Sequence, residues 1–270
     1  MQSLVSIAIP IYKSHPTKDE LCAFRQCYYV LSNYDIYIVT YKELDIFEYI
    51  TCVNNNLRCV FFDKSYFVSI YGYNTLLKEY HFYKTFSKYE YLLIYQLDAW
   101  VFKDNLKEWC MKGYDYIGAP WFTDFGSHEE GNELWKVGNG GLSLRKITKF
   151  LRITNPKTHY KSVSEVFQSE YLGGVKSLVS CILRCIGHRN TIAYFKQTYR
   201  GLNEDYYFSV EISQYKNLQL KIPSVYESAF FSFERSPRFL FELTKHELPF
   251  GCHAWKKYDQ EFWIDKIHYP

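Results

Sequence analysis

Short apolar runs alternate with stretches of helical periodicity along the first hundred residues of the chain. In the stretch 16–32, Leu21, Phe24, Cys27 and Leu31 recur at the spacing of one helix face. We predict strands at 4–9, 35–40, 57–62 and 91–95, and helices at 16–32, 43–52 and 72–86. Strands that alternate with helices indicate an α/β fold, with a mostly parallel central sheet flanked by helices.

The alternation becomes less regular after residue 98. The pair Gly173-Gly174 interrupts the longest helical stretch, and the C-terminal tail lacks a clear period. We predict a short segment at 103–112, a strand at 114–117, a loop at 123–137, a mainly helical region at 162–188, a helix at 203–213, and mixed strands and loops at 221–270. Because no repeat or linker divides the chain, we expect one domain, 1–270, with a mixed α+β C-terminal part.

The composition is that of an ordinary globular protein. Apolar residues make up 47% of the chain, and the net charge of +3 is small, which argues against a nucleic-acid partner. The eight cysteines form no CxxC pair, so we expect reduced thiols and no zinc site. The first ten residues predict a strand and not a signal peptide, and no apolar run is long enough to span a bilayer. The expected location is the cytoplasm.

Aromatic residues are abundant, with 27 Tyr and 21 Phe. A general bias of composition explains most of them. A sharper alternative is that some Tyr and Trp line a sugar site, since a flat apolar face with a polar tip suits a sugar ring.

Asp98 lies three residues beyond the end of the apolar strand predicted at 91–95. In an open parallel sheet, ligands bind beyond the carboxyl ends of the strands. A carboxylate at that place can hold a divalent cation that bridges a diphosphate. The alternative is that Asp98 only caps the next turn.

Three further segments carry candidate chemistry. The glycines of 137–145 (VGNGGLSLR) let a backbone pass close to a ligand, although a plain tight turn is the alternative. Glu204 and Asp205 open a helix, where acidic residues are favoured by the helix dipole and where one of them can also act as a general base. His253 lies between small residues and a Trp, and it is either structural or a ligand of a metal or phosphate.

Together, these segments resemble a family of largely uncharacterised bacterial proteins assigned to the GT-A glycosyltransferases. The resemblance covers roughly 5–255, and GNGGLSLR after an Asp-ended strand is its most specific part. It implies a single GT-A (Rossmann-like) domain, with 1–120 as the nucleotide-binding half and 121–270 as the acceptor-side half. The opening VSIAIPIY, 5–12, is similar to the first strand of many GT-A enzymes, whose following loop meets the nucleotide base.

The resemblance also implies roles for single residues. Asp98 and His253 are the expected ligands of a divalent cation, Mn or Mg. Asp205, or its neighbour Glu204, is the expected catalytic base of an inverting enzyme. The expected donor-binding residues are Pro10, Tyr12, Asn74, Gln96, Asp98, Asn139, Gly140 and Gly141.

One position departs from the family pattern. GT-A enzymes use an Asp-x-Asp motif, and Gln96 occupies the place of its first acid. Because Gln supplies no charge, the site either binds metal more weakly or works without it. Arg145, Lys256 and Lys257 are then the candidates to neutralise a leaving diphosphate.

The resemblance implies transfer of a sugar from a nucleotide-sugar donor, a UDP-sugar first, to a hydroxyl of a glycan or lipid-linked acceptor in bacterial surface polysaccharide synthesis. The basic and apolar segment 176–189 suggests peripheral attachment to the inner face of the membrane, and an ordinary core helix is the alternative. Two other functions stay open. A nucleotidyltransferase is disfavoured because the loop after the first strand has no glycine. A non-catalytic glycan-binding or scaffold protein on a degenerate transferase fold is kept open by Gln96.

Overall fold

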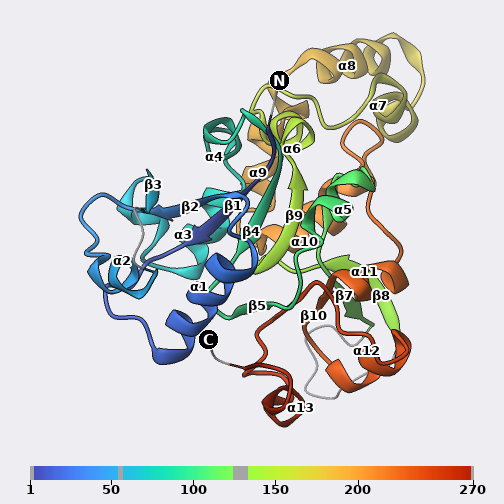
Figure 1. Ribbon diagram of the computed structural model, residues 1–270. Coiled ribbons are helices and arrows are strands. Elements are labelled where there is room, and N and C mark those ends of the chain that lie inside the picture. The colour runs from blue at the N-terminus through green and yellow to red at the C-terminus, as the bar shows by residue number, and fades with distance from the viewer. Residues whose placement is uncertain (1–2, 54–56, 124–132, 269–270) are drawn as a thin grey trace.

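The computed structural model describes residues 3–53, 57–123 and 133–268. Its centre is a six-stranded sheet (Figure 1). The strand order is β3 (Arg58–Phe61), β2 (Asp35–Thr40), β1 (Ser3–Pro10), β4 (Tyr89–Tyr95), β9 (Leu142–Lys146) and β6 (Tyr116–Ile117). The first four strands are parallel, and β9 runs antiparallel between β4 and β6. The predicted α/β fold with a mostly parallel central sheet is confirmed.

Side chains of the central strands enter two separate cores, one on each face of the sheet. On β4, Leu93 and Tyr95 join the core that contains α1, whereas Leu92 and Ile94 join the opposite core. A strand buried on both faces must be apolar at nearly every position, and this is why these strands appear in the sequence as continuous apolar runs. Helices α1 (Lys18–Val30), α2 (Phe47–Val53) and α5 (Leu106–Met111) contribute to the first core, and α3 (Ile70–Leu77), α4 (Tyr80–Thr85), α6 (Ile147–Thr154) and α9 (Ile192–Thr198) to the second.

The order of the parallel strands reverses beside β1. The chain passes from β1 through β2 to β3 on one side, and β4 then pairs with the other side of β1. In open α/β sheets, such a switch point opens a crevice at the carboxyl ends of the two strands, and ligands bind there. The crevice here lies beyond Pro10 and Tyr95.

A third core forms in the C-terminal part around Trp100, Cys252 and Trp263. A three-stranded sheet supports it, in the order β10 (Ser232–Phe233), β11 (Gly251–His253) and β5 (Ala99–Val101). Helices α11 (Val225–Phe231), α12 (Pro237–Leu243) and α13 (Gln260–Ile264) lie around it, and β7 (Ala119–Phe122) pairs with β8 (Leu134–Gly138).

Several predicted elements differ from the structure. The long helix predicted at 72–86 is divided into α3 and α4, because Glu79 adopts an extended backbone and ion-pairs with Lys196. The loop predicted at 123–137 ends in β8, and residues 124–132 of it lie outside the described residues. The tail predicted as strands and loops holds three helices.

The stretch predicted as one helix at 203–213 consists of three short helical segments, each of a different helix type. It contains α10 (Glu204–Tyr206), a π-helical turn at Tyr207–Glu211 and a 3-10 turn at Ile212–Gln214. Single π-helical turns occur often at functional sites. Two further 3-10 turns lie at Lys64–Tyr66 and His188–Asn190.

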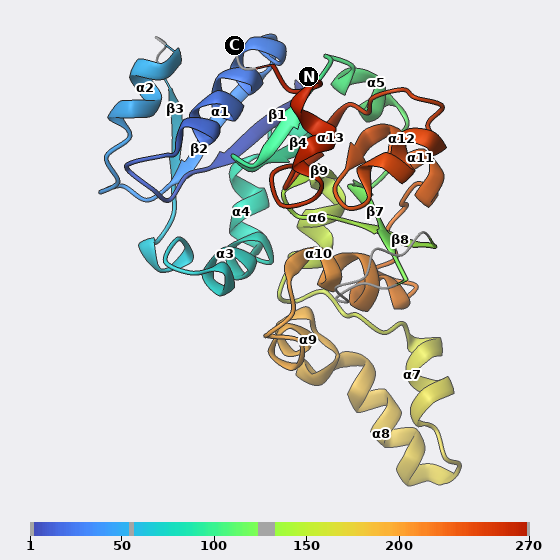
Figure 2. The same ribbon diagram turned by 90° about the horizontal axis from the view of Figure 1, so that it is seen from below.

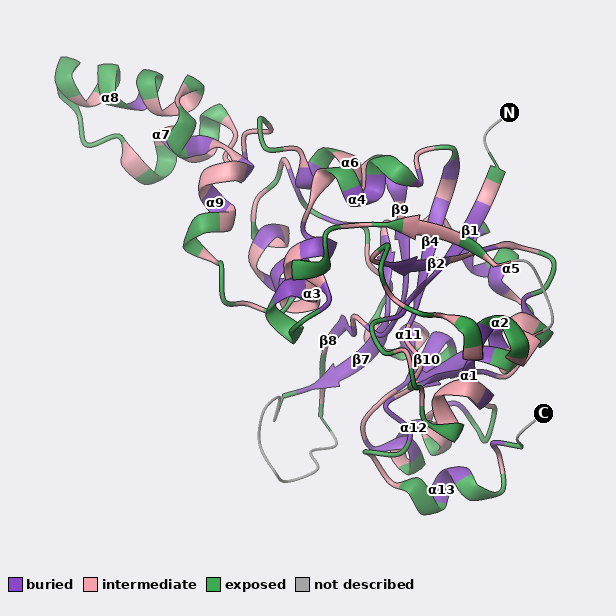
Figure 3. Cartoon of the chain, turned by 90° about the vertical axis from the view of Figure 1, so that its left-hand side faces the viewer, coloured by how far each residue is buried: buried purple, intermediate pink, exposed green. Residues whose placement is uncertain are grey.

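Helices α7 (Val163–Glu170) and α8 (Gly174–Ile186) form a hairpin that projects away from the central sheet (Figure 2). Gly173 and Gly174 turn the chain between them with φ of +92° and +79°, which only glycine adopts without strain. Most of this hairpin is exposed or half-buried (Figure 3). No helix within the described residues is long and apolar enough to cross a membrane.

Candidate active site

A pocket of about 660 Å³ lies at the carboxyl ends of β1 and β4, where the sheet order reverses. Its walls come from the loops after these strands, from the glycine-rich turn, from the start of α10 and from the end of β11. The structure brings all eleven sequence-predicted residues to this pocket: Pro10, Tyr12, Asn74, Gln96, Asp98, Asn139, Gly140, Gly141, Glu204, Asp205 and His253.

Strand pairing in the small sheet places Asp98 beside His253. β5 and β11 are antiparallel, with His253 opposite Ala99, the residue after Asp98. The backbone N–H of Ala254 donates to the carbonyl of Asp98 at 2.9 Å. As a result, His253 Nε2 lies 3.1 Å from Asp98 Oδ1.

The His253 imidazole is held between three oxygen acceptors. Its Nε2 also faces Gln96 Oε1 at 3.3 Å, and its Nδ1 faces Glu234 Oε1 at 3.0 Å. Glu234 directly follows β10, which runs parallel to β11, so the same sheet that aligns Asp98 aligns Glu234. A carboxylate on Nδ1 fixes the orientation of the ring and directs Nε2 into the pocket.

These contacts determine the charges of the cluster. Burial alone would lower the pKa of His253, but Asp98 and Glu234 outweigh it and raise that pKa to about 10. Burial opposes ionisation of Asp98, and the neighbouring His253 outweighs this, so the pKa of Asp98 lies below its ordinary value. The resting cluster is therefore an imidazolium between carboxylates at neutral pH.

Few protein ligands for a metal ion converge in this pocket. Across residues 3–53, 57–123 and 133–268, no group of three or more His, Cys, Asp or Glu is placed to hold one. Asp98 is a suitable donor, His253 becomes one when its imidazolium loses the Nε2 proton, and Gln96 adds a neutral amide oxygen. Mg²⁺ is commonly bound by only one or two protein carboxylates plus substrate phosphates, so the pair fits a partial metal shell that a ligand would complete.

The glycine-rich turn contacts both the acidic pair, Glu204 and Asp205, and the His253 ring. Asn139 has φ of +83° and accepts the N–H groups of Gly141 and Leu142 on its Oδ1, at 2.8 and 3.3 Å. A Cβ on Gly140 would overlap Glu204 Oε1, and a Cβ on Gly141 would overlap the His253 ring. Both positions therefore require glycine, because the backbone lies directly against these side chains.

Glu204 is engaged in a fully buried ion pair. Its Oε1 accepts from Arg145 Nη2 at 2.8 Å, and both side chains are at most 2% exposed. Arg145 is further fixed by Ser143 and by the hydroxyl of Tyr83. The proposal that Arg145 neutralises a leaving diphosphate is therefore wrong, because its charge is already compensated away from the open pocket.

The two lysines predicted for the same role differ. Lys256 is ion-paired with Asp19 and does not line the pocket. Lys257 lines it, and contacts with Tyr258 raise the pKa of its ammonium group. Lys257 is the one candidate of the three that the structure places at the site.

Asp205 is positioned differently from Glu204. Its Oδ2 accepts the N–H of Gly140 at 3.1 Å, and its Oδ1 accepts the N–H of Tyr206 at 2.8 Å. Burial, followed by the negative charge of Glu204, raises the pKa of Asp205 to about 7. A carboxylate that titrates near neutral pH can accept and return a proton, which suits a general base.

An aromatic cluster lies next to Asp205. The rings of Trp121 and Trp135 stack at 6.4 Å with an angle of 24°, and Tyr206 stacks on Trp121 at 6.3 Å. Trp135 is 37% exposed. Trp121 is 3% exposed, so Trp135 and Tyr206 form the accessible part of the cluster, which lies outside the lining of the pocket.

Sequence reasoning missed several residues of this pocket. Glu234 belongs to no motif, and only the non-local pairing of β10 with β11 places it. Tyr73 and Glu20 also line the pocket, as do the aromatic and apolar residues at 66–70. The one available signal for this wall was the apolar stretch 66–71 (YFVSIY), which lies between the predicted strand at 57–62 and the predicted helix at 72–86.

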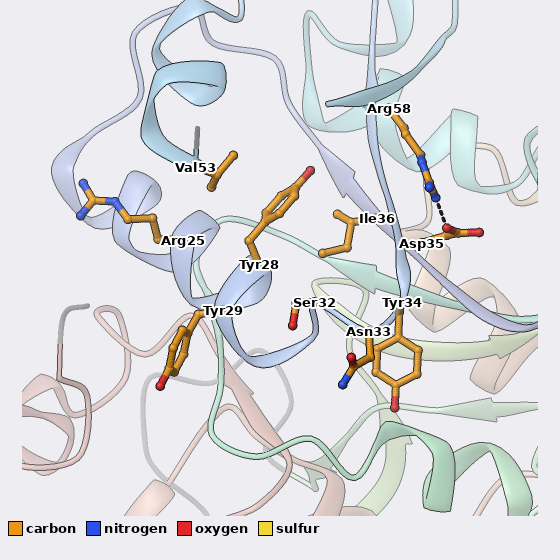
Figure 4. Close-up of a pocket in the computed structure, with 10 residues that line it drawn as sticks. All are labelled: Arg25, Tyr28, Tyr29, Ser32, Asn33, Tyr34, Asp35, Ile36, Val53 and Arg58. Atoms are coloured by element: carbon orange, nitrogen blue, oxygen red, sulfur yellow. Dashed lines mark hydrogen bonds and ion pairs between the residues drawn. The ribbon is translucent and has the colours of Figure 1, made fainter. Parts of the chain in front are cut away.

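A second pocket, of about 550 Å³, lies at the opposite edge of the sheet (Figure 4). It surrounds the start of β2, where Asp35 ion-pairs with Arg58, and Tyr28 and Tyr34 line it. None of the sequence-predicted residues lies there, and the amino ends of parallel strands are not where such sheets bind ligands.

The chain belongs to the family DUF5672, which is described as a protein family of unknown function. The family model matches residues 56–253. This range contains the Asp98 motif, the glycine-rich turn, the acidic pair and His253. No curated protein matches the chain.

Three solved structures are similar to the chain at low identity. A protein A197 from STIV has 14% identity and a TM-score of 0.32, over 57% of this chain and 70% of its own. A glycosyltransferase involved in the glycosylation of the major capsid of PBCV-1 has 8% identity and a TM-score of 0.41, over 93% of each chain. The WbbM bifunctional glycosyltransferase has 8% identity and a TM-score of 0.44, over 94% of this chain and 46% of its own.

Two of these three structures are described as glycosyltransferases. Because all three TM-scores lie below 0.5, the function proposed below rests on the pocket and not on these likenesses.

The raised pKa of Asp205 has a consequence for stability. Its pKa in the folded protein, about 7, exceeds the ordinary value of 3.8, so the ionised form is disfavoured by folding. Wild-type protein should therefore lose stability between about pH 4 and 7 relative to Asp205→Asn. We expect Asp205→Asn to be more stable at pH 8 by on the order of 1–2 kcal/mol, as measured by denaturant unfolding.

Asp265→Asn, at an exposed carboxylate far from the pocket, is the matched control. Equal stability of Asp205→Asn and wild type at every pH would show that Asp205 is not held in a disfavoured charge state.

Proposed function

We propose that the protein is a glycosyltransferase of the GT-A type, which moves a sugar from a nucleotide-sugar donor to a hydroxyl group of a glycan or lipid-linked acceptor. One observation carries the proposal. One pocket at the switch point of the sheet holds the charged Asp98–His253–Glu234 cluster and also Asp205, a carboxylate with a pKa of about 7. The cluster lies against Gly141, and Asp205 contacts the preceding residue, Gly140.

The glycine-rich turn sets the spacing between these two groups. Gly140 donates to Asp205, and Gly141 lies against His253. Consecutive Cα atoms are about 3.8 Å apart, so the two groups contact neighbouring residues of one turn. A donor sugar above this turn would have its diphosphate at the His253 end and its reacting carbon towards Asp205.

The donor half of the pocket suits a nucleotide diphosphate. Pro10 and Tyr12 follow β1, and Tyr12 is 54% exposed and available to a nucleotide base. At the other end, the imidazolium of His253 and the ammonium of Lys257 supply positive charge for the leaving diphosphate. A UDP-sugar is the donor that we would test first.

A divalent cation, Mn or Mg, remains part of the proposal. Asp98 and His253 would hold it, with the cation taking the place of the Nε2 proton of His253, and phosphate oxygens of the donor would complete its shell. Bound there, the cation would offset charge that develops on the diphosphate. Without the cation, the imidazolium itself supplies the positive charge. Because Gln96 replaces an acid, we expect cation affinity to be weak until the donor is present.

The proposed reaction is a single displacement with inversion. Asp205 accepts the proton of the acceptor hydroxyl, whose oxygen forms a bond to the anomeric carbon of the donor sugar. The bond from that carbon to the diphosphate oxygen breaks, and the nucleoside diphosphate leaves with the electron pair. We assign the base to Asp205 and not to Glu204, since Arg145 already compensates the charge of Glu204.

The acceptor side favours a glycan. Trp135 and Tyr206, which pack on the buried Trp121, are accessible near Asp205 outside the lining of the pocket, and sugar rings pack their apolar faces on aromatic rings. These two rings would orient the acceptor so that one hydroxyl points at the carboxylate.

Asp98→Asn should remove productive donor binding while it leaves the fold intact, because Asn preserves the side-chain size and a hydrogen bond to His253. Wild-type protein should be stabilised by nucleoside diphosphates, and more strongly with Mn²⁺. A ligand at 100 times its Kd adds about 2.7 kcal/mol of stability. Thermal unfolding with a panel of nucleoside diphosphates measures this. We expect the Mn²⁺-dependent part to vanish in Asp98→Asn and to persist in Asp265→Asn; its persistence in Asp98→Asn would remove Asp98 from the donor site.

Asp205→Asn should lower kcat for transfer by about 100-fold to 10,000-fold, with donor KM changed only a few-fold. Glu204→Gln is the informative comparison. It breaks the buried pair with Arg145, so we expect it to lower the stability of the fold by about 3–5 kcal/mol. Steady-state kinetics and thermal unfolding of both variants separate the roles. If Glu204→Gln, and not Asp205→Asn, removes turnover in folded protein, the base is Glu204.

A further inference from the structure

Helix α8 exposes its apolar face. Its apolar side chains are between 40% and 75% exposed. These residues are Val175, Leu178, Val179, Ile182, Leu183 and Ile186. Leu172, at the tip of the hairpin, is 92% exposed and lies next to the half-exposed Tyr171.

The exposed residues form one continuous stripe. Their spacings of three, one, three, one and three residues place them on a single helix face. The one buried residue of α8 is Cys181. An amphipathic helix normally turns its apolar face to the core, and here that face is turned to solvent (Figure 3).

Basic residues dominate the sequence around this stripe, although Glu170 of α7 ion-pairs with Arg184 of α8 at 3.5 Å. No Asp or Glu occurs between Glu170 and Glu204, whereas the same 171–203 stretch contains five basic residues. These are Lys176, Arg184, Arg189, Lys196 and Arg200. Among the described residues, Lys176 and Arg189 are exposed and form no ion pair.

We infer that the α7–α8 hairpin docks the protein on an anionic lipid bilayer, with α8 lying in the plane of the interface. A helix with an apolar face, basic residues and no acid in its own sequence has the composition of such interfacial helices. Its 13 residues span about 20 Å, which suits a helix that lies on a membrane and does not cross it. Tyr171 and Leu172 at the tip add an aromatic and an aliphatic anchor.

Charge complementarity separates a lipid surface from a second copy of the chain. In a symmetric dimer formed through α8, the exposed Lys176 and Arg189 of both copies would lie near one interface and repel one another. Anionic headgroups oppose the basic border with the opposite charge, and acyl chains take up the apolar stripe. The inference goes beyond the proposed sugar transfer and does not rest on it, since no residue of the stripe lines the active-site pocket.

Sedimentation with lipid vesicles tests the inference on the full chain. We expect wild-type protein to sediment with vesicles of phosphatidylcholine and phosphatidylglycerol at 0.1 M salt. At least tenfold less should sediment with phosphatidylcholine alone. Higher salt should weaken binding, because the distance over which exposed charges attract one another is about 10 Å at 0.1 M and becomes shorter as the ionic strength rises.

Two variants test the two parts of the surface. Ile182→Glu with Leu183→Glu places charge in the stripe at exposed positions and should reduce vesicle binding at least tenfold. Lys176→Gln with Arg189→Gln should remove the preference for anionic vesicles. Circular dichroism and thermal unfolding check that both variants are folded.

The matched controls carry the same changes elsewhere. Met111→Glu with Ile264→Glu alters two exposed apolar residues outside the hairpin, and Lys42→Gln with Lys245→Gln removes two exposed lysines. Both controls should bind vesicles like wild type.

Three results would overturn the inference. Wild-type protein could fail to bind either kind of vesicle. The stripe variant could bind as well as wild type does. Light scattering could show that wild type is a stable oligomer that binds no vesicles and that the stripe variant makes monomeric, which would identify α8 as a contact between copies. Because transfer activity on a water-soluble acceptor is measured separately, failure here and failure of the proposed function are distinguishable.

Discussion

The candidate site depends on one imidazole ring that joins three distant parts of the chain. His253 bonds to Asp98 after β4 and to Glu234 after β10, and it stands at the end of β11. Its position is set by the three-stranded sheet β10–β11–β5 and not by a local motif. Two carboxylates around one buried ring would repel each other strongly if the ring were neutral, so the charge on the imidazole is what allows them to share the space.

The glycine-rich turn extends this arrangement to the second reactive group. Gly141 lies against His253 and Gly140 against the acidic pair, and neither position has room for a side chain. Arg145, from the strand that follows the turn, fixes Glu204 in the core. The buried Glu204 then acts on Asp205 through its charge and helps raise the pKa of that carboxyl to about 7. A structural ion pair thus tunes the group that faces the pocket.

Much of the central fold could be predicted from the sequence, because strands buried on both faces are apolar at every position. The C-terminal helices could not, since α11, α12 and α13 have only five to seven residues and show no full helical period. The break between α3 and α4 depends on the distant contact of Glu79 with Lys196. The single-domain organisation, with halves 1–120 and 121–270, stays a prediction.

For the site, residues near a recognisable motif could be predicted to lie together, and the structure places all eleven that were predicted as catalytic, donor-binding or metal-binding at one pocket. Their roles stay predictions. Glu234 could not be found, because only strand pairing brings it to His253. Arg145 was misassigned because the sequence does not show which cation is already paired in the core.

The most direct test of the account is the product released from nucleotide substrates. Purified protein would be incubated with a panel of nucleotide sugars, and separately with nucleoside triphosphates and sugar phosphates. Our account predicts slow release of nucleoside diphosphate from a nucleotide sugar, faster release when a glycan acceptor is added, and none with Asp98→Asn. Release of pyrophosphate from a triphosphate, or glycan binding with no release from any donor, would contradict it.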